Sequence, residues 1–207
     1  MHACARIEAE HRMITVAAYD RHVEQLFELM RRLHAALTKA KVDYRIVGGM
    51  AVFFQVSERD PDAARLTRDV DIAIDRSDIE RIARVAEDFG FRYQHAAGVD
   101  MLVDAKQPKA RSAVHLLFVR EKVRPDYLEP VPGFSEPTVT AEGILLAPVS
   151  DLLRMKLTSF RLRDKTHVID MDSVGLITPE IEAGLPDSLR RRLQQVREEE
   201  AQSTGAE

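Results

Sequence analysis

The feature that most constrains the fold is a Gly-Gly pair at 48–49, which stands between a β-prone run and an apolar run. Residues 44–47, Tyr-Arg-Ile-Val, favour a strand, and the six residues after the pair can begin a helix. Residues 67–74 then alternate apolar and charged side chains at their start, as in a strand with two unlike faces. We therefore predict a strand, a tight glycine turn, a helix and a second strand with Asp69 and Asp71 on one face.

The remaining patterns place helices around a mixed sheet. Apolar residues at steps of three and four predict helices over 20–41 and 79–89; a capping box at 77–80 opens the second helix, which ends at Gly90. Further strands are predicted over 91–94, 100–103, 112–119 and near 144–146, a loop over 125–137, and helices from 150, over 165–174 and from 186 to 200. The predicted fold class is α/β (α+β), a mixed β-sheet flanked by helices, with C-terminal helices.

The length of the chain fits one main domain. With ~100–200 residues typical of a domain, 207 residues allow one compact core with appendages, and 45% hydrophobic residues can fill that core. We divide the chain into an N-terminal arm (1–19), a core (20–148), a C-terminal helical region (149–200) and a disordered tail (201–207).

The bulk composition excludes several classes of protein. Thirty Lys and Arg against 34 Asp and Glu give a net charge of −4, too near neutral to indicate a nucleic-acid-binding protein. The single cysteine, Cys4, excludes an internal disulfide and a cysteine-rich zinc site, and favours a reducing compartment. No stretch approaches the ~18 apolar residues of a membrane span, and the apolar run at 13–18 is too short for a signal peptide. We expect a cytoplasmic protein without a membrane partner.

The glycine pair and the two aspartates together predict a nucleotide site. Two carboxylates about 7 Å apart on one strand face must meet water or share a cation. Mg²⁺ is usually held by one or two carboxylates and the phosphates of a substrate, so Asp69 and Asp71 suit it. Backbone N–H groups of Gly48 and Gly49 can approach phosphate oxygens because no Cβ intervenes. Each motif alone is more often a plain turn or a solvated strand face, but their order favours a Mg²⁺–nucleoside triphosphate site.

The stretches Ile46-Val47-Gly48-Gly49 and Thr67-Arg68-Asp69-Val70-Asp71-Ile72 resemble the signature of the nucleotidyltransferase superfamily with a DNA-polymerase-β-like core. The stretch 156–175, KLTSFRLRDKTHVIDMDSVG, is similar to the abortive-infection (AbiEii/AbiGii) toxin-type branch, and the resemblance covers about residues 20 to 180. It implies that Mg²⁺ is bound by Asp69 and Asp71 and that nucleotide is bound by Gly48, Gly49, Arg68, Lys156 and Asp170.

The chain departs from this family at the third carboxylate, which serves as the general base. The strand most like the family's reads Ala-Val-His-Leu-Leu at 113–117, with His115 in place of an Asp. A neutral histidine can accept a proton near its ordinary pKa of ~6.5, but it cannot bridge two Mg²⁺ ions as a carboxylate does. Asp100 or Asp104 could serve instead if the strand register differs. The structural alternative is a core histidine with a satisfied hydrogen bond.

The predicted function is transfer of a nucleoside monophosphate from a triphosphate to a hydroxyl of RNA, protein or a small molecule. Asp69, Asp71, His115 and Lys156 are the predicted catalytic residues, and the branch implies a cognate antitoxin-like protein. Lys156 could otherwise be a lysine that extends its head to water. One rival function is a catalytically impaired nucleotide-binding or protein-interaction module. Another is RNA binding through a basic patch with net charge +4, formed by Arg154, Lys156, Arg161, Arg163 and Lys165 against Asp164.

Overall fold

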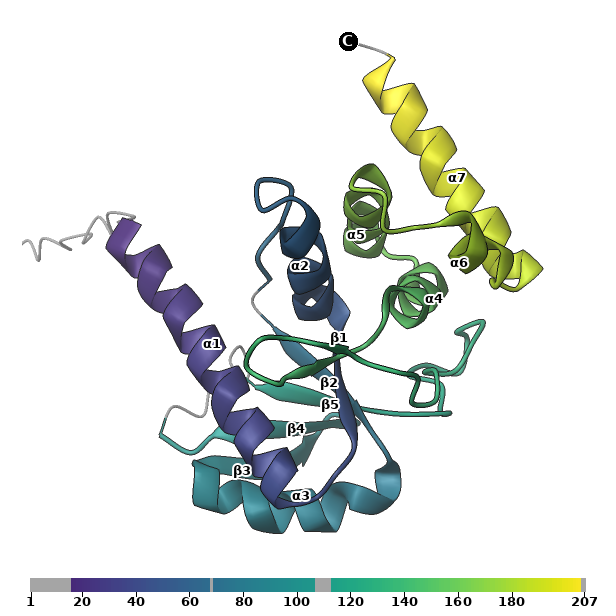
Figure 1. Ribbon diagram of the computed structural model, residues 1–207. Coiled ribbons are helices and arrows are strands. Elements are labelled where there is room, and N and C mark those ends of the chain that lie inside the picture. Colours follow the sequence, from purple (N-terminus) through teal and green to yellow (C-terminus); the bar gives the residue numbers. More distant parts are fainter. Residues whose placement is uncertain (1–15, 68, 107–112, 206–207) are drawn as a thin grey trace, which may run out of the picture.

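The computed structural model describes residues 16–67, 69–106 and 113–205. Within them, seven strands form one mixed sheet in the order β3-β4-β5-β2-β1-β7-β6 (Figure 1). The strands are β1 (Tyr44–Val47), β2 (Val70–Ile74), β3 (Phe91–Ala96), β4 (Val99–Asp104), β5 (Val114–Phe118), β6 (Thr138–Val139) and β7 (Leu145–Leu146). Strand β2 pairs antiparallel with β1 and parallel with β5. The predicted α/β class with a mixed sheet is confirmed.

Helices lie on both sides of this sheet. They are α1 (Val16–Lys39), α2 (Gly48–Arg59), α3 (Ile79–Ala86), α4 (Val149–Ser159), α5 (Leu162–Ser173), α6 (Pro179–Ala183) and α7 (Asp187–Thr204). Helix α2 contacts β1 and β2 as well as α4 and α5, and α7 packs on α4 and α5. Figure 1 shows α3 beneath the sheet and α4 to α7 gathered on the opposite side, next to α2. The glycine turn at the start of α2 therefore lies where the sheet meets the C-terminal helices.

Strand alternation separates an apolar face of the central strands from a face with polar residues. Ile46, Ile72 and Leu116 are paired across β1, β2 and β5, and all three are buried. The preceding residues of β2 and β5, Asp71 and His115, are paired with each other and point to the opposite face. The apolar face anchors the three strands in the core, and the opposite face is left for polar chemistry.

The capping box predicted at 77–80 is wrong, because the cap lies two residues earlier. The Asp75 side chain accepts hydrogen bonds from the Ser77 backbone N–H at 3.1 Å and from its hydroxyl at 2.7 Å. Residues 76–78 form a 3-10 turn, and α3 begins only at Ile79. Gly90, with a φ of 78°, ends this helical segment in the left-handed conformation, as expected.

The chain ends differ from the predicted boundaries. Helix α1 begins at Val16, inside the stretch predicted as an arm, and residues 1–15 lie outside the described residues. Helix α7 reaches Thr204, four residues into the stretch predicted as a disordered tail. Propagation of a formed helix adds one hydrogen bond for each residue fixed, so Glu-, Ala- and Gln-rich sequence extends it without burying anything. The short elements α6 and β6 were not predicted.

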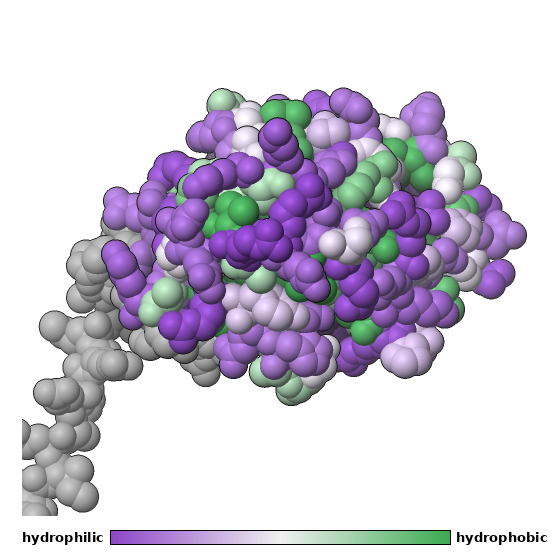
Figure 2. Space-filling model, turned by 90° about the horizontal axis from the view of Figure 1, so that it is seen from below, coloured by the Kyte–Doolittle hydropathy of each residue, from purple (hydrophilic) through white to green (hydrophobic). Residues whose placement is uncertain are grey.

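Figure 2 shows the face seen from below as largely hydrophilic, with small separate hydrophobic areas. In the described part of the chain, no helix is both long and apolar enough to cross a membrane.

A long connection, the 119–137 loop, joins β5 to β6 without a helix or strand. This loop becomes one wall of the candidate site.

Candidate active site

The Asp71 carboxylate lies directly against the glycine turn. The antiparallel pairing of β1 with β2 places Asp71 opposite Val47, the residue before the turn. Gly48 has a φ of 70°, and a Cβ at this position would overlap Asp71 Oδ2 and lie 3.0 Å from its Cγ. Only glycine accepts both the left-handed backbone and this close approach without strain. The turn and the carboxylate therefore form one unit, although they are 23 positions apart in sequence.

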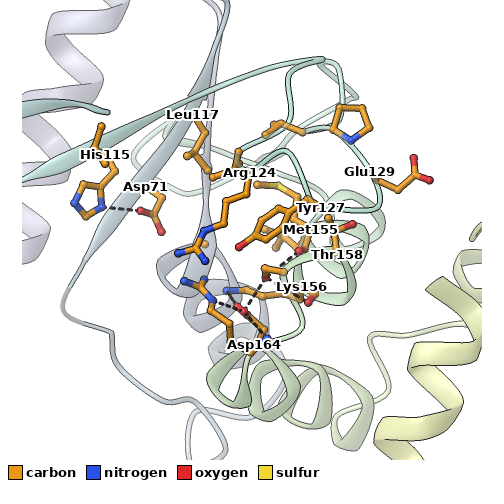
Figure 3. Close-up of a pocket in the computed structure, with 18 residues that line it drawn as sticks. Asp71, His115, Leu117, Arg124, Tyr127, Glu129, Met155, Lys156, Thr158 and Asp164 are labelled. Atoms are coloured by element: carbon orange, nitrogen blue, oxygen red, sulfur yellow. Dashed lines mark hydrogen bonds and ion pairs between the residues drawn. The ribbon is translucent and has the colours of Figure 1, made fainter. Parts of the chain in front are cut away.

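His115 completes a pair with Asp71 from the neighbouring strand. The parallel pairing of β2 and β5 sets the two residues side by side, and His115 Nδ1 lies 3.0 Å from Asp71 Oδ1 (Figure 3). The hydrogen bond to Asp71 raises the pKa of His115 above 6.5; burial opposes this shift, and the charges of Asp71 and Asp69 add to it. With Asp71 accepting from Nδ1–H, the Nε2 of a neutral imidazole is left as a proton acceptor.

Lys156 enters the same cavity from α4. Its side chain is 8% exposed, and its Nζ lies 3.2 Å from Oδ1 of Asp164, which is 1% exposed (Figure 3). Burial lowers the pKa of Lys156, while Asp164 and then Asp71 favour its charged form. A buried ammonium with two carboxylates nearby is positioned by its surroundings, which excludes the alternative of a lysine with its head in water.

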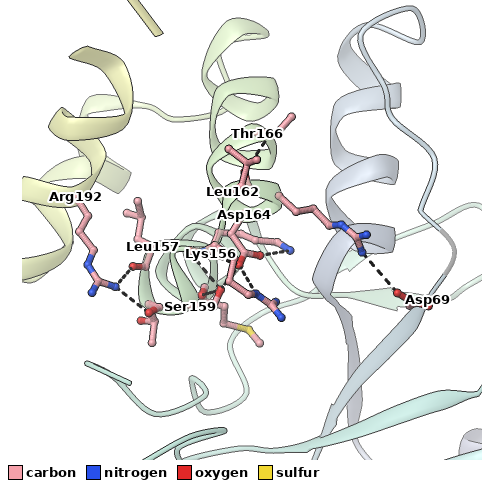
Figure 4. Close-up of polar contacts among 12 residues, drawn as sticks. Asp69, Lys156, Leu157, Ser159, Leu162, Asp164, Thr166 and Arg192 are labelled. Carbon is pink, nitrogen blue, oxygen red and sulfur yellow. Dashed lines mark hydrogen bonds and ion pairs between the residues drawn. The ribbon is translucent and has the colours of Figure 1, made fainter. Parts of the chain in front are cut away.

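Asp164 organises the corner between α4 and α5. Its Oδ2 accepts hydrogen bonds from the Ser159 hydroxyl at 2.7 Å, from Arg161 Nε at 2.8 Å and from the Arg161 backbone N–H at 3.2 Å (Figure 4). Burial raises the pKa of Asp164, but these bonds and the Lys156 charge outweigh burial and lower it overall. Phe160 turns the chain here with a φ of 52°. The corner thus holds Lys156 and Arg161 around one buried carboxylate.

These groups line a cavity of about 310 Å³. Its walls come from the glycine turn, from β2, β4 and β5, from the 119–137 loop and from the helices α4 and α5 (Figure 3). Gly48 lines it together with the polar side chains of Asp71, His115, Arg124, Lys156 and Arg161. The sheet and the C-terminal helical region both contribute, so the cavity exists only when the two predicted regions pack together.

Asp69 stands apart from this cavity. It precedes β2, is not among the cavity-lining residues, and its Oδ2 lies 3.7 Å from Arg163 of α5 (Figure 4). Both side chains are well exposed, at 40% and 72%, so this ion pair is weak. The charge of Asp69 nevertheless contributes to the raised pKa of His115, which places Asp69 near the Asp71–His115 pair.

The donor set fits one magnesium ion but not two. Over the described residues, no three His, Cys, Asp or Glu side chains are grouped closely enough to hold a metal by themselves. Asp71 and Asp69 supply the one or two carboxylates with which Mg²⁺ joins the phosphates of a substrate. The third strand position is an imidazole hydrogen-bonded to Asp71, and nitrogen is a poor ligand for a hard cation. A second ion therefore lacks its bridging carboxylate.

The alternative third carboxylates are both engaged elsewhere. Asp100 accepts hydrogen bonds from the Tyr93 hydroxyl at 2.5 Å and from His95 Nδ1 at 2.8 Å. Asp104 forms an ion pair with Arg32 of α1 at 2.5 Å. Met101, and not Asp100, is the β4 residue paired with His115, so both aspartates point to the opposite face of the sheet. The register excludes them as partners of Asp71.

Two further predicted nucleotide-binding residues lie outside the cavity lining. Asp170 of α5 is buried and forms an ion pair with Arg65 at 2.9 Å. Gly49 packs closely instead, since a Cβ there would lie 3.0 Å from Thr67 and 3.1 Å from His167 Cε1. Arg68 lies outside the described residues.

The predicted basic patch is not a continuous free basic surface. Lys156 and Arg161 share Asp164, and Arg163 faces Asp69. The other two cations also have acidic partners: Arg154 lies 3.8 Å from Glu129, and Lys165 lies 2.7 Å from Glu199. Because each cation has a carboxylate nearby, this stretch gives little support to RNA binding through an exposed patch.

Sequence reasoning missed the contribution of the 119–137 loop. Arg124 was not among the predicted site residues, yet it lines the cavity together with Tyr127. The available signal was a cation three residues before an aromatic in a long loop, the kind of segment that often carries function. Asp164 was counted only as a charge against the basic patch, and the buried His167 was not considered.

The mixed sheet with helices on both sides matches the fold of a solved nucleotidyltransferase. No protein-family model matches the chain, and no curated protein matches it in sequence. Among solved structures, it is similar to the aminoglycoside nucleotidyltransferase ANT(2'')-Ia. A solution structure of that antibiotic-resistance factor has a TM-score of 0.53 and 11% identity, covering 90% of this chain and 100% of that one. A crystal structure with adenylyl-2''-tobramycin has a TM-score of 0.52 and 12% identity, covering 83% of this chain and 98% of the other.

Proposed function

We propose that the protein is a nucleotidyltransferase that moves a nucleoside monophosphate from a triphosphate to a hydroxyl of an acceptor. The observation that carries this proposal is the contact of the Asp71 carboxylate with the glycine turn, in a cavity that also holds a buried lysine. The likeness of fold to ANT(2'')-Ia supports the reaction class. The acceptor is an RNA, a protein or a small molecule, and the adenylylated tobramycin in one ANT(2'')-Ia structure supports the last.

The phosphate chain lies between the glycine turn and the α4–α5 corner. Backbone N–H groups at the start of α2 face its oxygens, and the positive end of the helix dipole favours anions there. Lys156 and Arg161 oppose the negative charge that grows as the bond between the α-phosphorus and the bridging oxygen breaks. Pyrophosphate leaves with that oxygen.

His115 prepares the attacking hydroxyl. Its Nδ1–H is donated to Asp71 Oδ1, which orients the ring and leaves Nε2 to take the proton as the acceptor oxygen bonds to the α-phosphorus. Asp71 stabilises the imidazolium that forms, in the way a carboxylate supports histidine in other enzymes. Histidine thus replaces the general-base carboxylate of the family in this role.

One Mg²⁺ ion, held by Asp71 and Asp69 together with the triphosphate, supplies charge neutralisation and orientation of the phosphates when bound. Asp71 can orient His115 and also contribute to the metal site, because its Oδ1 faces His115 and its Oδ2 faces the glycine turn. Asp69 reaches this role by leaving its weak contact with Arg163. Asp170, which is paired with Arg65, acts through the position of α5.

The experiment combines binding with turnover on the full chain. Thermal stabilisation by a non-hydrolysable triphosphate is measured with and without MgCl₂, and pyrophosphate release is measured with RNA, protein and small hydroxyl acceptors. We expect both signals to be lost in Asp71→Asn and to be reduced in Asp69→Asn. Asp62→Asn, an exposed aspartate in the same connection between α2 and β2, is the matched control. Wild-type signals in Asp71→Asn would disprove the assignment.

A second candidate is a nucleotide-binding or protein-interaction module that has lost turnover. The observation that favours it is the imidazole at the third strand position, with no group of three metal-ligating side chains in the described ranges. In that case the triphosphate stabilises the wild type but not Asp71→Asn, and no acceptor gives pyrophosphate. The AbiEii/AbiGii branch and its antitoxin-like partner remain predictions from the sequence motifs. Co-purification with the product of an adjacent reading frame tests them.

A further inference from the structure

Arg124 lines the cavity and has no carboxylate partner among the described residues. In the described part of the chain its guanidinium contacts the Tyr127 ring, with 5.9 Å to the centroid, and forms no ion pair. Its neighbours in the same loop differ: Arg120 pairs with Asp75 at 2.7 Å, and Glu121 pairs with Arg76 at 2.6 Å. An arginine aimed into a cavity without an internal partner is available to a ligand.

The loop holds Arg124 in place through its backbone. Arg120 N–H donates to the Val131 carbonyl at 2.8 Å and Val131 N–H donates to the Glu121 carbonyl at 2.8 Å, which closes the loop at its base. Within it, Tyr127 N–H donates to the Arg124 carbonyl at 3.1 Å. Val131 is buried and joins the main core. These contacts point the Arg124 side chain from the loop into the cavity, towards the side with Asp71 and Lys156 (Figure 3).

The charges inside the cavity favour an anion. Lys156 and Arg161 share the single carboxylate of Asp164. Glu129, the lining acid nearest to Arg124 in sequence, faces Arg154 at 3.8 Å. Arg161 lines the same cavity as Tyr127 of the loop and Asp71 of β2. Three cations from two segments of the chain therefore surround one space that two aspartates, Asp164 and Asp71, also line, which leaves one positive charge in excess for an anion.

We propose that Arg124 is the third cation of a polyphosphate site, and that the phosphate chain lies between the 119–137 loop and the α4–α5 corner. The planar guanidinium can donate two parallel hydrogen bonds to a phosphate, which the ammonium of Lys156 cannot do. The inference rests on the proposed function, because the polyphosphate is that of the nucleotide. It adds that the loop contributes to binding of the phosphate chain and that the site recognises this chain without the nucleoside.

Calorimetric titration with inorganic tripolyphosphate, without Mg²⁺, tests the proposal on the full chain. We expect the wild type to bind and Arg124→Gln to bind about tenfold or more weakly, the range for hydrogen bonds to a charged group. Arg124→Lys should lie between them because it keeps the charge and loses the paired donors. Lys122→Gln removes the same charge two positions away, from an exposed residue outside the cavity lining, and should bind as the wild type does.

The inference is overturned if the wild type does not bind tripolyphosphate, or if Arg124→Gln binds it within twofold of the wild type. An equal loss in Lys122→Gln also overturns it, since the effect would then be one of general charge. Nucleotide turnover measured on the same proteins separates this outcome from that of the proposed function. Unchanged turnover in Arg124→Gln would disprove the inference but keep the proposed enzymatic function. Tripolyphosphate binding that depends on Arg124, without turnover by the wild type, would support the inference and disprove the enzymatic function.

Discussion

Asp71 occupies the space that a side chain on Gly48 would need. The two residues meet because Val47 and Asp71 are opposite each other in the β1–β2 ladder, which brings the turn after β1 onto the start of β2. Any residue larger than glycine at position 48 would have a strained left-handed backbone, and its side chain would collide with the carboxylate. The pair therefore links backbone conformation to the position of the proposed catalytic group.

Substitution Gly48→Ala should damage both the fold and the site. The left-handed backbone alone costs alanine about 1–2 kcal/mol, and the overlap with Asp71 forces the carboxylate away from the turn. Gly98→Ala is the matched control, because Gly98 has a φ of 75° and open space around its missing side chain. Urea unfolding and nucleotide turnover should show a larger loss of stability in Gly48→Ala, with activity lost only there. Equal effects in the two variants would mean that the Asp71 contact is unimportant.

Replacement of His115 tests the fit to a metal. His115→Asp sets a second carboxylate beside Asp71, so like charges repel and stability falls relative to the neutral His115→Asn. Mg²⁺ should recover that loss because the new pair of carboxylates supplies the oxygen ligands that a bridging ion needs. Thermal denaturation in EDTA and in MgCl₂ measures this, with ~2–4 °C expected for each kcal/mol. A gap between the two variants that does not change with MgCl₂ contradicts the prediction.

The local sequence was sufficient to predict the turn and the central strands. A β-prone run, a glycine pair and an alternating strand are local signals, and β1, α2 and β2 follow them closely. His115 lies on a strand beside Asp71, and this pairing follows from two neighbouring strands with one polar position each. Its role in place of the third carboxylate stays a prediction. The cap of the 3-10 turn that leads into α3 was missed because Asp75 and Ser77 both suit such a position, and only the backbone path decides between them.

The loop and helix contributions to the cavity were beyond local reasoning. Whether Arg124 faces the cavity depends on how the 119–137 loop folds back. The backbone hydrogen bonds of Val131 with Arg120 and Glu121 close this loop, and the residue types involved do not predict such a pairing. Asp170 had a plausible role on α5, but the helix turns it towards Arg65. The direction of a side chain on a packed helix depends on the neighbouring elements. In a helix with many polar residues, the sequence does not show which face packs against them.

Removal of one member of the buried Lys156–Asp164 pair should have unequal effects. Asp164→Asn leaves a buried ammonium without its carboxylate and weakens the bonds from Ser159 and Arg161, a loss of about 3–5 kcal/mol. Lys156→Met should cost less, because Asp164 keeps those other donors. The double variant should regain part of the Asp164→Asn loss, since no unpaired cation is left. Chemical denaturation of the three variants measures the order, and a larger loss in Lys156→Met would contradict it.

His167 should make the fold sensitive to acid. It is buried beside Gly49, and its Nδ1 has no hydrogen-bond partner among the described residues. Burial, with Lys156 adding to it, lowers the pKa of His167 from 6.5 to about 4. Between these values the unfolded chain binds a proton that the folded chain does not, so the stability present above pH 6.5 falls by about 3 kcal/mol as the pH drops to 4. In His167→Leu the free energy of unfolding should fall less between pH 7.5 and pH 4, as measured by urea unfolding. The exposed control His95→Gln should show the same fall as the wild type. If His167→Leu loses stability over this range as steeply as the wild type, another group causes the acid limb.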